Sequence, residues 1–168
     1  MECYDHRLEE IRVHQEHTAE RVDLKIRVLT GAEKAALELA DPDGRGSAKQ
    51  EAKAWEPIRL SVDQPRLWWT NGLGDQPLYT MKAAVQDPDG TVDERVLRLG
   101  LRTMTVKREK DQWGESFAIC CNGTAFFAMG GDYIPEDSLL TRMSREKTRR
   151  LLQDCRDCHF NSIRVWDS

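Results

Sequence analysis

The sequence has no long apolar run, no excess of positive charge and no leader-like start. No apolar stretch approaches the roughly 18 residues of a membrane-spanning helix, so an integral membrane protein is not expected. The net charge of -4 provides no basic footprint for a phosphate backbone, so nucleic acid is not an expected partner either. The stretch from Met1 to Asp5 has neither a basic segment nor an apolar core, which favours a cytoplasmic location.

The cysteine content does not suit a disulfide framework. The chain has five cysteines, an odd number, and the neighbouring Cys120 and Cys121 would point to opposite faces of a strand. Reduced thiols are therefore expected, including Cys3, Cys155 and Cys158.

The length of 168 residues suits either one domain or a domain of about 100 residues followed by part of another. The composition, with 39% hydrophobic and 32% charged residues, is that of a globular protein. The charged stretch from Lys107 to Trp113 is the best candidate boundary, which favours the second arrangement.

The first part of the chain predicts a β-sandwich, because short strand-like runs alternate with turn residues. Asp41-Pro42-Asp43-Gly44 and Asp87-Pro88-Asp89-Gly90 combine a proline with a glycine that accepts positive φ, and both are predicted as tight turns. The small, polar stretch 44–53 is predicted as a surface loop. The predicted strands are 11–13, 22–29, 35–39, 58–62, 78–85 and 92–101.

The second part predicts a hairpin and then a strand, a helix and a strand. The pair Asn122-Gly123 favours a type I′ turn between strands at 116–121 and 124–129. That turn explains the sequon Asn122-Gly123-Thr124 better than glycosylation does. An apolar strand leads into Gly130-Gly131-Asp132-Tyr133, and a last strand covers 161–166, with Arg164 at its carboxyl end.

The predicted helix between these strands begins at Ser144, which can cap it, and Glu146 places a negative charge in its first turn. Apolar and small residues recur at helical spacing and predict one buried stripe. The stripe contains Thr148, Leu151, Leu152, Cys155 and Cys158.

Two motifs have alternative interpretations. Cys155-Arg156-Asp157-Cys158-His159 matches a c-type haem attachment signature, but both thiols fall on the predicted buried face, and core cysteines are the favoured interpretation. No further ligand pair completes a zinc site, so neither a cofactor nor a metal is expected. Trp68 and Trp69 suit sugar binding or packing, and packing is favoured.

The carboxylates Asp132, Glu136 and Asp137 lie close together in the sequence. Glycosidases use two carboxyls roughly 5 to 9.5 Å apart, and these normally come from different elements. One short loop is not expected to supply both.

Taken together, several blocks in order make the chain resemble the middle of a family 2 glycoside hydrolase of the β-mannosidase type. The blocks are Pro65 to Tyr79 (including Trp68-Trp69-Thr70-Asn71-Gly72), Gly100-Leu101-Arg102-Thr103, Phe117 to Gly123, Gly130 to Ser138, and Asn161-Ser162-Ile163-Arg164-Val165-Trp166.

The resemblance implies an immunoglobulin-like sandwich over residues 11–107, after an N-terminal extension of residues 1–10. Residues 108–168 then resemble the opening hairpin and the first strand, helix and second strand of a (β/α)₈ catalytic barrel, which takes roughly 250 residues when whole. Both catalytic glutamates are implied to lie beyond Ser168, so the chain alone is expected to be inactive.

By the same resemblance, Arg164 matches an arginine that holds the nucleophile carboxylate, and Trp166, Asp132 and Tyr133 support the active site. Asp132 and Asp167 depart from the asparagine and glycine that the family has there. The implied partner is a terminal β-mannoside or a related β-glycoside, and the unfinished barrel edge is expected to self-associate. The alternative is a stand-alone sandwich module that binds carbohydrate or protein without catalysis.

Overall fold

The computed structural model describes residues 7–53, 55–88 and 90–166, which form two compact units. Of the described residues, the sandwich unit contains those up to 68 together with those in 77–102. The second unit contains 69–76 together with the residues from 103 onward. No helix in the described part of the chain is long and apolar enough to span a membrane.

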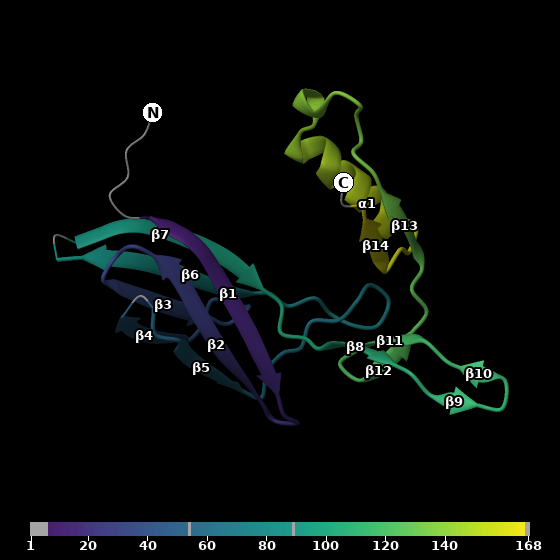
Figure 1. Ribbon diagram of the computed structural model, residues 1–168, viewed down its shortest axis with the longest axis horizontal. Helices are drawn as coiled ribbons and strands as arrows, with labels where there is room; N and C mark the ends of the chain where they lie inside the picture. Colours follow the sequence, from purple (N-terminus) through teal and green to yellow (C-terminus); the bar gives the residue numbers. More distant parts are fainter. Residues whose placement is uncertain (1–6, 54, 89, 167–168) are drawn as a thin grey trace. The chain divides into compact units, whose positions relative to one another are not determined.

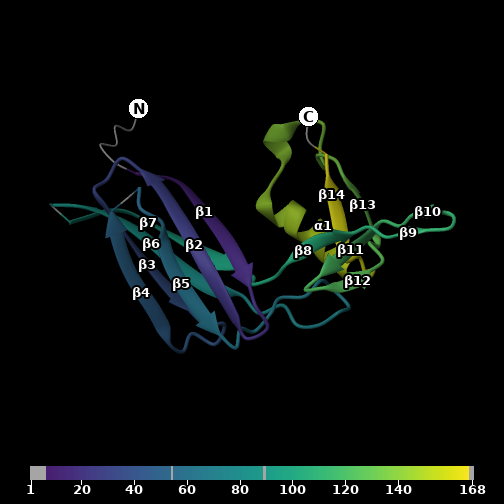
Figure 2. The ribbon, with the colours of Figure 1, turned by 60° about the horizontal axis from the view of Figure 1, so that its bottom comes forward.

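Two antiparallel sheets face each other in the sandwich unit (Figure 1). One sheet has the strand order β1-β2-β5 and the other β4-β3-β6-β7, and Figure 2 shows both from another side. The predicted immunoglobulin-like sandwich is thus confirmed. Its strands are β1 (Leu8–His17), β2 (Arg21–Thr30), β3 (Lys34–Ala40), β4 (Ser47–Lys53), β5 (Ile58–Asp63), β6 (Tyr79–Asp87) and β7 (Gly90–Leu99).

The core of the sandwich follows from the alternation of its strands. Val22, Leu24 and Ile26 point inward from β2, and Met81 and Val85 point inward from β6, all essentially inaccessible to solvent. Removing each such side chain from water contributes about 1.5 to 3 kcal/mol. The sandwich unit therefore has a complete hydrophobic core of its own.

One loop prediction in this unit is wrong. Residues 44–53 contain the strand β4, which pairs with β3 from Lys34↔Lys53 to Ala40↔Ser47. An edge strand needs ladder bonds on one side only and few apolar side chains, so a polar sequence can form it. Ala52 nevertheless packs against the core.

The turn at Asp41 forms as predicted, whereas the first strand begins earlier than predicted. The turn at Asp41 is confirmed, because Gly44 has φ 72° and its amide donates to the Asp41 carbonyl at 3.0 Å. In the second turn Gly90 has φ 126°, while Asp89 lies outside the described residues. β1 begins at Leu8, earlier than the predicted strand.

The second unit contains three small sheets. β12-β11-β8 is antiparallel, and its β11–β12 turn has Asn122 at φ 49° and Gly123 at φ 80°, which confirms the predicted hairpin. β9 and β10 form a short hairpin, and β13 and β14 are parallel. The strands are β8 (Met104–Lys107), β9 (Lys110–Asp111), β10 (Gly114–Glu115), β11 (Ala118–Cys121), β12 (Thr124–Phe126), β13 (Gly130–Tyr133) and β14 (Ser162–Val165).

Between β13 and β14 lie the short helix η1 (Leu140–Arg142) and the helix α1 (Arg145–Asp157). The predicted helix start is confirmed, because Ser144 Oγ accepts a hydrogen bond from the Lys147 amide at 3.3 Å. The predicted burial of its apolar stripe is wrong, since Leu151 and Leu152 are 38% and 44% exposed and Cys158 is exposed. A sheet of two strands is too narrow to cover the stripe.

Candidate functional site

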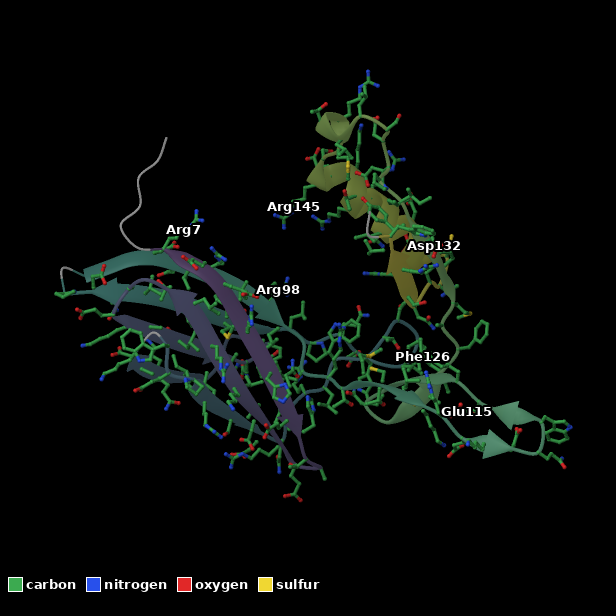
Figure 3. All side chains as sticks on the ribbon, in the orientation of Figure 1. Arg7, Arg98, Glu115, Phe126, Asp132 and Arg145 are labelled. Atoms are coloured by element: carbon green, nitrogen blue, oxygen red, sulfur yellow. The ribbon has the colours of Figure 1, made fainter. Side chains whose placement is uncertain are left out.

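The parallel pair β13 and β14 places the predicted site residues next to one another. Asp132 lies directly opposite Arg164, and Tyr133 lies opposite Val165. Because the pair is parallel, the carboxyl ends of both strands meet at one edge, as in a (β/α)₈ barrel. Asp132 is labelled in Figure 3.

Gly130 permits the close approach of the two strands. A Cβ atom at this position would overlap the Ser162 carbonyl oxygen, whereas one at Gly131 would meet only the Phe160 ring at an ordinary 3.6 Å. A glycine within a strand often marks such a close backbone approach. The register that brings Asp132 to Arg164 therefore depends on the glycine at 130.

Asn161 fixes the same register from the start of β14. Its Nδ2 donates to the Phe127 carbonyl at 3.0 Å, and its Oδ1 accepts from the Met129 amide at 2.9 Å. The Asn161 amide donates to the Met129 carbonyl at 2.9 Å. Three bonds thus tie the residue before β14 to the segment that enters β13.

Asn71 secures the end of α1. Its Nδ2 donates to the Phe160 carbonyl at 3.0 Å and to the Arg156 carbonyl at 3.3 Å. Phe160 lies beyond the end of α1, and the Arg156 carbonyl also accepts from the His159 amide at 2.9 Å. Asn71 therefore adds a side-chain donor to the turn that follows the helix. This contact holds the connection between α1 and β14.

Asp132, Arg164 and Trp166 form a connected polar group at the strand ends. The Trp166 indole Nε1 donates to Asp132 Oδ2 at 3.0 Å, and Arg164 Nη1 lies 3.7 Å from the same oxygen. The Arg164 guanidinium also lies over the Trp166 ring, 5.0 Å from its centre. The Arg164 side chain is 70% exposed, so its ion pair contributes little stability and the guanidinium is free to bind another anion.

Tyr133 belongs to a second polar group in the loop after β13. Its hydroxyl donates to Glu136 Oε2 at 2.9 Å, and the Thr148 hydroxyl donates to Glu136 Oε1 at 2.9 Å. The hydrogen bond to Glu136 raises the pKa of Tyr133, and loss of hydration adds to the rise. Glu136 therefore links the loop to the first turn of α1, and Asp137 accepts from the Leu139 amide at 2.9 Å within the loop.

The two tryptophans considered for sugar binding are partly buried in local contacts. Trp68 packs against Gly100, and the Arg102 guanidinium lies 4.1 Å from the centre of its ring. Trp69 packs against Gly74. These contacts favour a packing role for both side chains.

The two cysteines of the motif from Cys155 to His159 are not both buried in a core. Cys120 and Cys121 are buried, but Cys155 is half-buried and Cys158 is exposed, so the core interpretation is wrong for Cys158. The four described cysteines are free, and Cys3 lies outside the described residues. Within the described ranges, no three histidine, cysteine or acidic side chains are grouped as metal ligands.

Several residues that position the site were not predicted. Gly130, Asn161 and Asn71 carry signals that could have been used, since a Gly-Gly pair in a strand and an asparagine before an apolar strand both mark special backbone contacts. The role of Glu136 depends on tertiary contacts, which no sequence pattern specifies.

In this chain an immunoglobulin-like sandwich is followed by a parallel strand, helix and strand, and the comparison with known families assigns it to the glycoside hydrolases. Residues 7–102 match the family described as glycosyl hydrolases family 2. The match covers more than half of the chain, and the chain therefore belongs to this family.

Among curated relatives, the chain is 36% identical over 109 residues to β-mannosidase B of Aspergillus terreus, covering 65% of this chain and 13% of that protein. It is 32% identical over 126 residues to β-mannosidase B of Aspergillus niger, covering 73% of this chain and 15% of that protein. The chain thus spans about one seventh of the length of these relatives.

Among solved structures, the β-D-mannosidase of Dictyoglomus thermophilum matches with a TM-score of 0.85 and 28% identity, covering 96% of this chain and 21% of that one. A β-glucuronidase of Ruminococcus gnavus matches with a TM-score of 0.74 and 20% identity, covering 98% and 26%. The second likeness concerns the fold alone.

Proposed function

We propose that this chain provides the sandwich and the opening of the catalytic barrel in a retaining glycoside hydrolase that acts on terminal β-mannosides or related β-glycosides. The likeness to three β-mannosidases supports this substrate class. In this proposal residues 11–107 form the scaffold and residues 108–168 begin the barrel. Both catalytic carboxylates are contributed by residues outside this sequence.

The observation that carries the proposal is the position of Arg164 at the carboxyl end of a parallel strand, opposite Asp132 and beside Trp166. In the proposed mechanism a carboxylate nucleophile forms a glycosyl-enzyme intermediate that water then hydrolyses. A guanidinium stays charged at every working pH and can bind a carboxylate through two parallel hydrogen bonds. Arg164 is therefore proposed to orient the nucleophile.

Asp132, Tyr133 and Trp166 are proposed to support the substrate and Arg164. Asp132 holds the indole of Trp166 and lies near the guanidinium of Arg164, so it sets the position of both side chains. The glycine that the family has after Trp166 is Asp167 in this chain, and Asp167 lies outside the described residues.

The test is a chimera in which this chain replaces the matching part of the Dictyoglomus thermophilum enzyme. We expect the chimera to hydrolyse 4-nitrophenyl β-mannoside and the 168-residue chain alone to be inactive. Arg164→Lys should lower kcat about 100-fold, because an ammonium cannot replace a bidentate guanidinium.

Arg150→Lys, the same change on the exposed surface of α1, serves as the matched control and should leave kcat unchanged. Hydrolysis by the purified chain alone, persisting after contaminating enzymes have been excluded, would contradict the proposal. So would a chimera in which Arg164→Lys has no more effect than Arg150→Lys.

A further inference from the structure

The outer face of the sheet β1-β2-β5 has an unusual distribution of charge. In the antiparallel register Arg12 lies directly opposite Arg27, His14 opposite Lys25, and Lys25 opposite Arg59. Directly opposite residues have Cβ atoms about 4.5 to 5.5 Å apart, and like charges in such pairs are destabilising. Two of these pairs, Arg12 with Arg27 and Lys25 with Arg59, therefore place positive charges directly opposite each other.

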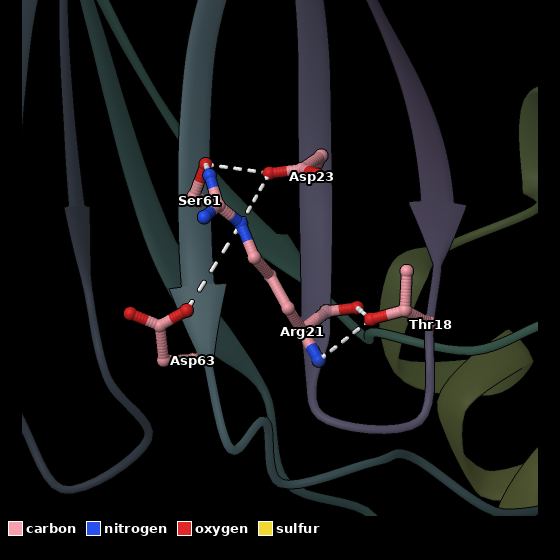
Figure 4. Close-up of polar contacts among 5 residues, drawn as sticks. All are labelled: Thr18, Arg21, Asp23, Ser61 and Asp63. Carbon is pink, nitrogen blue, oxygen red and sulfur yellow. Dashed lines mark hydrogen bonds and ion pairs between the residues drawn. The ribbon is translucent and has the colours of Figure 1, made fainter.

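In the neighbouring rows of the same face, the charge of Arg21 is paired with carboxylates. Arg21 Nε lies 2.7 Å from Asp23 Oδ1, and the Ser61 hydroxyl donates to the same oxygen at 2.6 Å (Figure 4). Hydrogen bonds from Ser61 and Arg21 hold the pKa of Asp23 below its usual value. Asp63 lies 4.0 Å from Arg21 on the other side.

Two of the cations, Lys25 and Arg27, have no such partner. Arg12 pairs with Glu10 at 2.8 Å, and His14 lies 3.8 Å from Glu16. In the part of the chain that the structure describes, no carboxylate forms an ion pair with Lys25 or Arg27, whereas the charge of Arg59 helps to lower the pKa of Asp23. The chain as a whole has a net charge of -4, so the positive charge on this face does not come from an overall excess of basic residues.

The cations also surround a hollow. A depression of about 270 Å³ is lined by Arg12, Val13, His14, Lys25 and Arg27. Guanidinium groups bind oxyanions in a bidentate manner, and an ammonium adds a further donor. Such a hollow can take one tetrahedral oxyanion together with a group attached to it.

We propose that this face of the sandwich binds a phosphate or sulfate group, either as the free ion or as an ester on a sugar. Arg27 and Lys25 are the principal ligands, because no carboxylate among the described residues forms an ion pair with them, and Arg12 completes the site from β1. A doubly charged oxyanion in the hollow offsets the repulsion between Arg12 and Arg27 and provides a counter-charge for Lys25. The site is independent of the proposed hydrolase activity and requires no catalytic residue.

The experiment is a titration of the 168-residue chain with inorganic phosphate, sulfate and glucose 6-phosphate, observed as backbone amide shifts by NMR. Sodium chloride at equal ionic strength corrects for screening. We expect saturable shifts at Arg12, Lys25 and Arg27. Arg27→Gln should weaken binding about tenfold, as expected for one charged hydrogen bond.

Arg98→Gln is the matched control, because it removes one positive charge from an exposed position of β7 in the other sheet (Figure 3). It should leave the affinity unchanged. Glucose 6-phosphate binding about tenfold more tightly than inorganic phosphate would assign the site to an esterified sugar, and equal affinities would assign it to the free ion.

Shifts that chloride reproduces, or equal weakening by Arg27→Gln and Arg98→Gln, would overturn the proposal. A second measurement uses the wild-type chain alone, so that it does not depend on variants that could fail to fold. Phosphate must raise the thermal midpoint of the wild-type chain more than chloride does at the same ionic strength, because a ligand stabilises the state that binds it. No rise would also overturn the proposal.

Discussion

The two units of this chain differ in how far they bury their apolar side chains. The sandwich unit excludes Val22, Ile26 and Met81 completely from solvent, and its two sheets cover each other's inner faces. In the second unit Phe127 and Val165 are 82% and 67% exposed, and α1 has no buried residue. Two antiparallel sheets close a core by themselves, whereas a parallel strand, helix and strand require further strands and helices to do so.

The largest expected effect tests whether the sandwich unit is stabilised by a closed core of its own. Met81→Ala should lower the free energy of unfolding by about 2 to 5 kcal/mol, because it leaves a cavity between packed sheets. Val165→Ala, at the exposed position in β14, should lower it by less than about 0.5 kcal/mol. Urea unfolding followed by circular dichroism measures both, and equal losses would show that the comparison is wrong.

The next prediction concerns the register of β13 and β14. Gly130→Ala should destabilise the second unit by about 1 to 3 kcal/mol, because the added methyl group would overlap the Ser162 carbonyl. Gly131→Ala is the control and should have little effect, since the nearest neighbour is the Phe160 ring at 3.6 Å. Loss of the NMR signature of the Trp166 indole bond to Asp132 in the first variant alone would confirm the prediction.

A third prediction uses Thr70 in the second unit. Its hydroxyl is buried and has no hydrogen-bond partner in the described structure. Thr70→Val should therefore stabilise the unit, by about 1 kcal/mol, because it replaces an unsatisfied polar group with an apolar one of the same shape. A lower thermal midpoint in the variant would indicate that the hydroxyl is bonded in solution.

The smallest effect concerns the loop after β13. Because Glu136 raises the pKa of Tyr133, Glu136→Gln should bring that pKa back toward 10.0. The folded-state pKa lies above the unfolded one, so this bond stabilises the loop fully below about pH 10 and the contribution is lost as pH rises through the higher value. NMR of the tyrosine ring carbons measures the titration, and an unchanged Tyr133 pKa would exclude Glu136 as the cause.

Much of the fold could be predicted because the sequence marks it locally. Alternating residues in β2, the turn at Asp41-Pro42-Asp43-Gly44 and the cap at Ser144 each specify structure within a few residues. β4 was missed because an edge strand takes its stability from pairing with β3 rather than from its own residues.

The positions of the candidate site residues could be predicted in part. The neighbouring positions of Asp132 and Arg164 follow from two parallel strands whose carboxyl ends meet. The burial of the α1 stripe was predicted wrongly, because helical periodicity identifies an apolar face but not what covers it. The bonds of Asn161 and Asn71 join residues far apart in the sequence, beyond the reach of local patterns.

Hydrogen exchange of the backbone amides in the 168-residue chain tests the difference between the two units most directly. Amides of β2, β3 and β6 should exchange only through global unfolding of the sandwich, while those of β13, β14 and α1 should exchange at least about 100-fold faster through local opening. Equal protection in both units would contradict the account, because the second unit would then possess a closed core of its own.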